Sequence, residues 1–238
     1  MDRKIALLIL VIFSLSISVS VFSQIPLTKK WDTEKIRGER NLPHPSFEGF
    51  PYLNRTWVIG KIEFNDGEVS DSLDFRYSSF KDELVYFNRE ISAQIVVDKA
   101  SLKGFSYVDS IGISHIFRRQ YFDGFAKGNR YFEVLSDADI DLLVYRKVKL
   151  SAVSPYKSVA GILRDQAYTT EYQYYFYSPT NGYTLVRPTL SGLLSKFDHT
   201  SQRPIKKLLR KNRIRISDED SFVLAWKCVD KVGFQLIF

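Results

Sequence analysis

Residues 57–77 read WVIGKIEFNDGEVSDSLDFRY, two alternating stretches separated by an Asp-Gly dipeptide. From Leu73 to Tyr77 every second residue is apolar, and the residues between them are polar. That two-residue period is typical of a strand with one buried face. Asp66 and Gly67 tolerate positive φ angles, so the dipeptide predicts a two-residue turn and the whole segment predicts a β-hairpin.

Strand-like stretches continue along the chain, bounded by turn residues, at 83–88, 92–98, 102–109, 112–119, 131–136, 140–149, 171–177 and 183–186. No amphipathic helical pattern lies between them, so neighbouring strands are expected to pair antiparallel. The stretch 150–170 has no clear period and is expected to be a loop. Residues 52–187 therefore predict an antiparallel β domain of about eight to ten strands, as a curved sheet or as an open β-barrel or sandwich.

After Pro188 the period becomes helical. The apolar residues of three successive stripes share the spacing of one helix face: Leu190, Leu193, Leu194 and Phe197; Ile205, Leu208 and Leu209; Phe222, Val223, Trp226 and Val229. Thr189 is a candidate N-cap for the first helix, and Ser217 with Asp220 resembles a cap for the third. Residues 188–238 thus predict a helical C-terminal subdomain packed on the sheet, and the fold class is mainly β, of the α+β type.

The first 23 residues have the features of a secretory signal peptide. Arg3 and Lys4 precede an apolar run, and small residues stand before a cleavage position ahead of Gln24. An uncleaved membrane anchor is the alternative, but interspersed serines and a length near the lower limit for a span disfavour it. No cysteine stands at the cleavage position. The sequence therefore predicts an exported protein of the periplasm, cell envelope or extracellular space that is not a lipoprotein.

Residues 24–51 are rich in proline and are expected to form an extended N-terminal arm, pinned to the body by Trp31, Phe47 and Phe50. Cys228 is the only cysteine, so the chain contains no disulfide partner for it and stability must come from packing. The composition, 15% aromatic with a formal net charge of +7, is that of a globular domain rather than a disordered chain.

Three segments resemble a family when taken in order. They are YLNRTWVIGKIEFNDGEVSDSLDFRYSSFKDELVYF (52–87), YFEVLSDADIDLLVYRKVKL (131–150) and KKLLRKNRIRISDEDSFVLAWKCVD (206–230). The set resembles a group of uncharacterised secreted Bacteroidota proteins that carry a Trp, a Gly and an Asp-Gly hairpin, then an FEVL–DG–LL hairpin, and finally a basic IKKNKL-type helix before an acidic-capped one. The resemblance implies a secreted or envelope location and carries no known activity, ligand or catalytic residue.

The residues that could carry chemistry form no recognisable motif. The histidines are His44, His115 and His199. They include no pair at i, i+4 and no HExxH, and the chain has no G-x-S-x-G. Asp137, Asp139 and Asp141 are spaced like the start of a calcium loop, but the residues that follow supply neither its glycine nor its distal acid. We therefore predict no catalytic residue, no cofactor and no metal site.

Two segments are candidate binding surfaces. RPIKKLLRKNRIR (203–215) is dense in basic residues, and YTTEYQYYFY (168–177) is a cluster of aromatic residues. For each, a structural role is the simpler interpretation: a helix with a solvated basic face, and rings packed in the core. As surfaces they predict contact with an envelope glycan, an anionic lipid or another envelope protein, and not with nucleic acid. The residues expected on such a surface are Tyr175, Tyr177, Lys206, Lys207 and Arg210.

These observations favour an exported envelope protein that binds a partner without catalysing a reaction. Two alternatives stay open. One is a hydrolase of envelope polymers, with a site assembled in space around His115 or an acidic pair; a deep pocket exposing His115 or Glu133 would favour it. The other is a small outer-membrane β-barrel, because residues alternate up to the terminal Phe238 as they do in the last strand of such barrels.

Overall fold

The structure is a computed structural model that describes residues 35–44, 46–124 and 127–237. The chain divides into two units, Met1–Asp32 and Thr33–Phe238, and all elements described belong to the second. The predicted signal peptide, Trp31 and the first part of the predicted arm lie outside the described residues.

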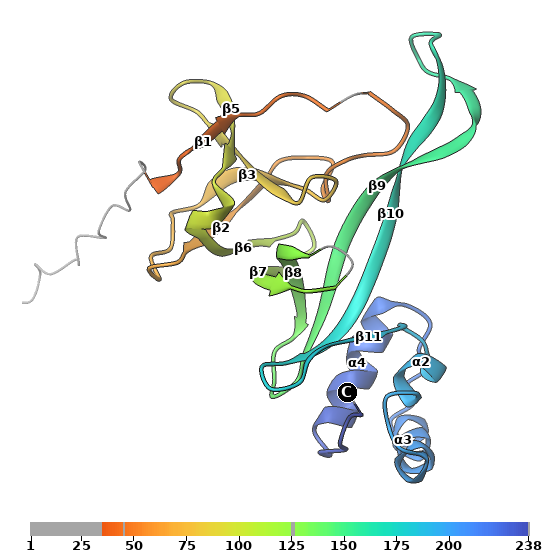
Figure 1. Cartoon of the computed structure of the whole chain (residues 1–238). Helices are drawn as coiled ribbons and strands as arrows, with labels where there is room; N and C mark the ends of the chain where they lie inside the picture. The colour runs from red at the N-terminus through yellow and green to blue at the C-terminus, as the bar shows by residue number, and fades with distance from the viewer. Residues whose placement is uncertain (1–34, 45, 125–126, 238) are drawn as a thin grey trace, which may run out of the picture. The chain divides into compact units, whose positions relative to one another are not determined.

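One antiparallel sheet contains all the strands of the described residues (Figure 1). The strands are β1 (Gly38–Arg40), β2 (Val58–Phe64), β3 (Leu73–Ser78), β4 (Glu83–Asn88), β5 (Ala93–Val97), β6 (Leu102–Val108), β7 (Ser114–Phe122), β8 (Gly128–Ser136), β9 (Asp141–Lys157), β10 (Leu163–Ser178) and β11 (Gly182–Val186). Their spatial order is β1-β5-β4-β3-β2-β6-β7-β8-β9-β10-β11. A 3₁₀ turn, η3 (Lys99–Ser101), returns the chain from β5 to the other side of β2. The sheet is open, with β1 and β11 at its edges.

The predicted fold class is confirmed. Ten of the 11 strands, β2 to β11, lie within residues 52–187, in agreement with the predicted number, and β1 comes from the predicted N-terminal arm. One detail of the prediction is wrong. The expected loop at 150–170 consists largely of strand, since β9 continues to Lys157 and β10 begins at Leu163. This part of the two strands forms a ribbon in which most side chains are exposed or half-buried. An apolar alternation is therefore absent, because it arises only where one face is buried.

The hairpin at Asp66 also differs from the prediction. Phe64 N donates to Glu68 O (2.9 Å), and Gly67 N donates to Phe64 O (3.0 Å), which encloses a three-residue loop rather than a two-residue one. Within this loop only Gly67 has a positive φ, of 83°. This is the common three-residue hairpin with a glycine in the left-handed position, and it explains why a glycine is required there.

The turn between β3 and β4 fills a fork in the sheet. β8 and β9 pair from Ser136↔Leu142 to Glu133↔Val144 and then diverge. Beyond this point Val148 N of β9 donates to Ser79 O (3.1 Å), and Tyr131 N of β8 donates to the Asp82 carboxylate (3.3 Å). The turn thus satisfies amides that lack a cross-strand partner, and the sheet curls so that its early strands contact its late ones.

Asp82 is the anchor of this turn. It has a φ of 60°, is buried, and accepts a hydrogen bond from Tyr77 Oη (2.6 Å). Lys99 pairs with the same carboxylate, and Arg130 Nη1 lies 3.7 Å from it. Burial raises the pKa of Asp82, although the hydrogen bonds from Lys99 and Tyr77 oppose the rise. Around it, the rings of Tyr77, Tyr131, Phe105 and Phe117 pack in tilted, edge-to-face and stacked arrangements.

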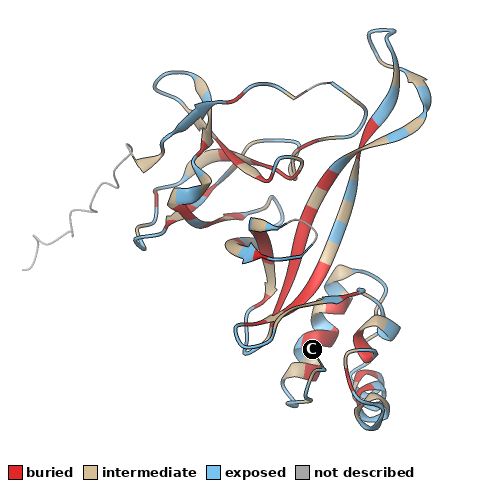
Figure 2. Ribbon diagram, viewed as in Figure 1, coloured by how far each residue is buried: buried red, intermediate tan, exposed pale blue. Residues whose placement is uncertain are grey.

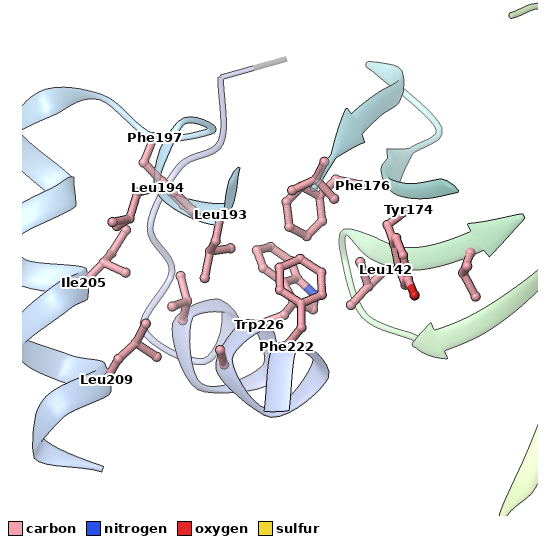
Figure 3. Close-up of a cluster of buried hydrophobic side chains, with 14 residues drawn as sticks. Leu142, Tyr174, Phe176, Leu193, Leu194, Phe197, Ile205, Leu209, Phe222 and Trp226 are labelled. Atoms are coloured by element: carbon pink, nitrogen blue, oxygen red, sulfur yellow. The ribbon is translucent and has the colours of Figure 1, made fainter. Parts of the chain in front are cut away.

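Three helices cover one face of the β9–β11 end of the sheet, as predicted (Figures 2 and 3). They are α2 (Leu190–Leu194), α3 (His199–Lys211) and α4 (Glu219–Asp230). The buried residues between helices and strands are Leu142, Val144, Tyr174, Phe176, Val186, Leu193, Leu194, Phe197, Ile205, Leu209, Phe222, Ala225, Trp226 and Val229. On the opposite face Phe122, Phe132, Leu143, Tyr145 and Tyr175 form a second cluster. Both faces of β9 and β10 are therefore covered here.

The helix caps follow from local sequence. Thr189 Oγ1 accepts from Gly192 N (3.0 Å), as predicted. For α4 the cap is Asp218 rather than Ser217: Asp218 accepts from Ser221 N (2.9 Å), and Ser221 Oγ accepts from Asp218 N (3.1 Å). A carboxylate at this position also interacts favourably with the positive end of the helix dipole.

We expect Asp82→Asn to lower the free energy of unfolding by about 2 to 3 kcal/mol, because Lys99 and Arg130 would lose their buried carboxylate. Asparagine tolerates a positive φ, so the substitution isolates the charge from the backbone conformation. Urea unfolding would measure the change. The control Asp71→Asn, at an exposed position, should stay within about 0.5 kcal/mol of the unmodified protein; an equal effect of both would contradict the anchoring role.

Candidate functional site

A chain of ionised side chains crosses three strands and reaches the helices. On β7, His115 Nδ1 lies 2.5 Å from the carboxylate of Glu133 on β8, and its Nε2 lies 3.3 Å from Asp109. The ring of Tyr107 stacks on the imidazole at 4.8 Å. Both ring nitrogens thus face carboxylates, which can only accept hydrogen bonds when ionised. Both nitrogens must carry protons, so the geometry favours the imidazolium.

The same chain continues to α4 through Arg146 of β9. Arg146 Nε donates to Glu133 (2.5 Å), while its Nη1 and Nη2 donate to the two oxygens of Glu219 (2.7 and 2.6 Å). Tyr174 Oη also donates to Glu219 (2.7 Å). This is a two-point arginine–carboxylate contact, the strongest kind of ion pair in proteins. It fastens the first turn of α4 to the sheet.

The pKa values agree with this network, which we define as Asp109, His115, Glu133, Arg146 and Glu219. The hydrogen bond with Glu133 raises the pKa of His115 above its usual value of 6.5. Burial alone would raise the pKa of Glu133, but its hydrogen bonds with His115 and Arg146 outweigh burial and hold the pKa below its usual value. The raised pKa of His115 and the lowered pKa of Glu133 are those expected of an imidazolium paired with a carboxylate.

The side chains of His115 and Glu133 are both engaged within the network. A general base needs a free lone pair near its substrate, and the imidazole of His115 has both nitrogens occupied. The Glu133 side chain is only 4% exposed. Four surface pockets formed by described residues have volumes of about 420 to 740 Å³, and neither His115 nor Glu133 lines any of them. We interpret the network as a connection between sheet and helices.

The second candidate is a basic surface on α3 and the segment after it. It consists of Arg203, Lys206, Lys207, Arg210, Lys211, Arg213 and Arg215, all of them exposed. The first five stand at i, i+3, i+4, i+7 and i+8 and so share one face of α3. None of the seven side chains forms a hydrogen bond or an ion pair with any residue that the structure describes. Between Asp198 and Asp218 the chain has no acidic residue to neutralise them.

The opposite face of α3 holds this surface in place. Ile205 and Leu209 are buried in the cluster shown in Figure 3, and Leu208 is packed against it. Asp198 caps the helix by accepting from Ser201 N (2.7 Å). The side chains of Ile205 and Leu209 therefore point inward, and the exposed residues of α3 are charged or polar except for Pro204.

Arg213 occupies a position where glycine is the usual residue. It has a φ of 56° and follows the last residues of α3, with Ile214 N donating to Leu209 O (2.9 Å) and Arg213 N donating to Arg210 O (3.0 Å). This is the helix-ending motif in which the left-handed residue is most often glycine. An arginine here is strained by about 1 kcal/mol. A strained residue whose side chain forms no hydrogen bond or ion pair with a described residue is a reason to look for an external partner.

The two tyrosines expected on the binding surface are not exposed there. Tyr175 is buried in the second aromatic cluster, and its Oη donates to Gln173 (2.7 Å). Tyr177 is half-buried, with its ring 4.6 Å from that of Tyr183. The period-two alternation of β10 places them on the face opposite the helices. Tyr172 of the same aromatic cluster is exposed beside Arg146, with its ring 4.8 Å from the guanidinium.

The other polar residues singled out from the sequence have local roles. Arg118 pairs with Asp137, in the β8–β9 turn, and with Asp141, the first residue of β9. His44 Nε2 lies 3.2 Å from Ser78 Oγ, and burial lowers its pKa. Cys228 is half-buried against the helical core, and His199 is exposed in the first turn of α3. No group of three histidine, cysteine or acidic residues among those described could hold a metal ion.

Sequence reasoning missed Arg146 and Glu219, although a signal was present. Arg146 interrupts the stretch 140–149, whose apolar residues stand at successive positions, as in a strand that is covered on both faces. A covered arginine requires a carboxylate partner. Which carboxylate it is cannot be read from spacing, because Glu133 and Glu219 come from separate elements.

We expect His115→Gln to lower stability by about 1 to 2 kcal/mol below pH 6, with a difference that shrinks as the pH rises. The stabilisation from a raised histidine pKa is complete below the unfolded value of 6.5 and is lost as the pH passes the folded value. Urea unfolding from pH 5 to pH 9 would measure this. His199→Gln is the control, and a difference independent of pH would contradict the charged imidazolium.

We expect Glu219→Gln to lower the free energy of unfolding by about 2 kcal/mol, because Arg146 would keep only one carboxylate partner. Asp220→Asn is a matched control: it removes a charge from the same first turn of α4, but Asp220 makes no ion pair among the described residues. The control substitution should lower the free energy of unfolding only by the lost interaction with the helix dipole, which is less than about 1 kcal/mol. Equal losses in thermal unfolding would count against the link between sheet and helices.

Comparisons with family models, with curated proteins and with solved structures find no match for this chain. The resemblance to secreted Bacteroidota proteins therefore stays a hypothesis, and the functional argument depends on the geometry of the described residues alone.

Proposed function

We propose that the protein is an exported, non-enzymatic binding module of the cell envelope that holds an anionic polymer on its basic surface. The observation that carries the proposal is seven exposed cations on and after α3 with no ion pair to any described residue. Most of a folded protein's charges lie near opposite charges, whereas a surface of one sign attracts ligands of the other.

The length of the surface favours a polymer over a small anion. From Arg203 to Lys211 a helix rises about 12 Å, and the chain continues past it to Arg215. The cations along this length do not converge on one point, as they would around a single phosphate. They form a strip that suits repeated phosphate, sulfate or carboxylate groups, each held weakly and all of them together more strongly.

The composition of the exposed face favours a soluble polymer over a bilayer as the partner of α3. Membrane-surface helices place an apolar face in the lipid and a basic face above it. In α3 that apolar face, with Ile205 and Leu209, is already buried in the core. No helix among the described residues is long and apolar enough to cross a membrane. An envelope glycan that carries acidic groups fits this basic face, because it needs no apolar face of α3 for its contact.

We expect the unmodified protein to be retained on immobilised dextran sulfate at about 0.1 M salt and to elute as salt screens the charges. The variant Lys206→Glu/Lys207→Glu/Arg210→Glu should elute near the void volume. The control Lys61→Glu/Lys81→Glu/Arg187→Glu changes net charge equally at exposed positions elsewhere. If both variants weakened retention equally, net charge alone would explain the effect, and the proposal that the polymer binds at α3 would be overturned.

The variant Arg213→Gly adds a second measurement to this test, one that separates an effect on binding from an effect on folding. The substitution removes one cation and places glycine in its favoured left-handed conformation. We expect retention to weaken about twofold, while the free energy of unfolding stays equal or rises by up to about 1 kcal/mol. Because a more stable protein would bind less well, unfolding could not explain the loss.

A further inference from the structure

The β9–β10 hairpin extends past its neighbouring strands (Figure 1). β8 pairs with β9 only at residues 142–144, and β11 pairs with β10 only at 174–178. Farther out, β9 and β10 pair with no other named strand and with each other up to Lys157↔Leu163, and Glu48 forms an isolated parallel bridge with Ala167. Residues 46–48 brace the middle of this arm: Tyr168 N donates to Glu48 O (2.8 Å), and Glu48 N donates to Tyr156 Oη (2.7 Å). The outer part is thus a supported arm rather than a free loop.

The turn at the end of the arm repeats the geometry of the first hairpin. Ser158 N donates to Ile162 O (2.9 Å), Gly161 N donates to Ser158 O (2.8 Å), and Gly161 has a φ of 76°. The two positions before the glycine hold Asn65 and Asp66 in the first hairpin but Val159 and Ala160 here. Asn and Asp suit such positions because their side chains bond to the turn backbone.

We define the arm tip as Val159, Ala160, Ile162 and Leu163. Val159 is fully exposed, and Ile162 and Leu163 are more than half exposed. Figure 2 shows the buried residues of the ribbon near its base and exposed residues at this end. Val159 and Ala160 thus stand at turn positions that Asn and Asp would suit better, and Val159 is not buried by any other part of the fold. Such a break with local preference indicates a role outside the fold.

Two cations, Lys157 and Arg164, flank the arm tip. The acidic residues near them stand farther from the turn: Asp165 follows Arg164 in β10, and Glu48 is held beside Tyr156. The Arg164 guanidinium lies over the ring of Phe47 at 5.3 Å, which holds this cation at the base of the tip. Apolar side chains at the end of a supported ribbon, with cations set behind them, match the two layers of an anionic membrane surface.

We propose that the arm tip inserts into the surface of an anionic lipid bilayer, with Lys157 and Arg164 at the level of the headgroups. The four apolar residues bury in the outermost acyl region, and the backbone of the turn keeps its own hydrogen bonds as it enters. The contact is shallow and reversible, because so few apolar side chains take part. It is separate from the basic surface on α3, where Ile205 and Leu209 are already buried in the core.

The test is flotation of the purified protein with vesicles of phosphatidylcholine alone or of phosphatidylcholine with about 30% phosphatidylglycerol, whose anionic headgroups give the surface a negative potential. The variant Val159→Asn/Ala160→Asp copies the Asn-Asp-Gly turn of the first hairpin and so should fold normally. We expect it to bind anionic vesicles at least about tenfold more weakly than the unmodified protein. Its retention on dextran sulfate should not change, which separates this proposal from the one for α3.

Because the basic surface also attracts anionic vesicles, the comparison is repeated in the Lys206→Glu/Lys207→Glu/Arg210→Glu background, where the tip substitution should again weaken binding. Ile111→Asn is the matched control, since Ile111 is an exposed apolar residue in a turn with the same hydrogen bonds. Equal weakening by Ile111→Asn, or none by the tip variant, would overturn the proposal. So would dimerisation without lipid that the tip variant abolishes, because the tip would then contact a second copy.

Discussion

The fork between β8 and β9 is the constraint on which the remaining structure depends. Two antiparallel strands that separate within a sheet leave backbone amides without partners, and a buried amide of this kind is costly. Here the β3–β4 turn supplies both acceptors, a carbonyl to Val148 and the Asp82 carboxylate to Tyr131. This arrangement requires the sheet to curl until strands far apart in its order come into contact. The curl in turn encloses the aromatic interior around Tyr77 and Phe105.

The charged network lies at the same fork. Glu133 and Val144 form the last β8–β9 pair, and Arg146 stands two residues beyond it on the same face of β9. Its guanidinium reaches back to Glu133 and outward to Glu219, so side chains connect the strands where the backbone ladder has ended. Once β9 is free of β8, it can continue with β10 as the projecting arm. The fork therefore determines where the helices attach and where the arm begins.

Much of the fold could be predicted from periodicity, but the features that depend on separate elements could not. The alternation in 57–77 predicted strands on either side of Gly67, because a half-buried sheet imposes a period of two. The ribbon at 150–170 was missed since neither of its faces is buried for most of its length. Arg213 shows a limit of another kind, because its left-handed conformation comes from how α3 ends, where most chains place glycine. For the candidate site, the density of Lys206, Lys207 and Arg210 was visible in the sequence, whereas the burial of Tyr175 depended on the second aromatic cluster.

The basic surface and the network place opposing demands on the helical end. Seven like charges on and after α3 repel one another, and this repulsion weakens the helices that present them. Ile205 and Leu209 oppose it by burial, and the contact of Arg146 with Glu219 opposes it by fastening α4 to the sheet. Any anion that neutralises the surface removes the repulsion, and a ligand bound only by the folded state stabilises that state. Tight attachment of the helices is thus the condition under which the uncompensated charges of α3 can persist without a ligand.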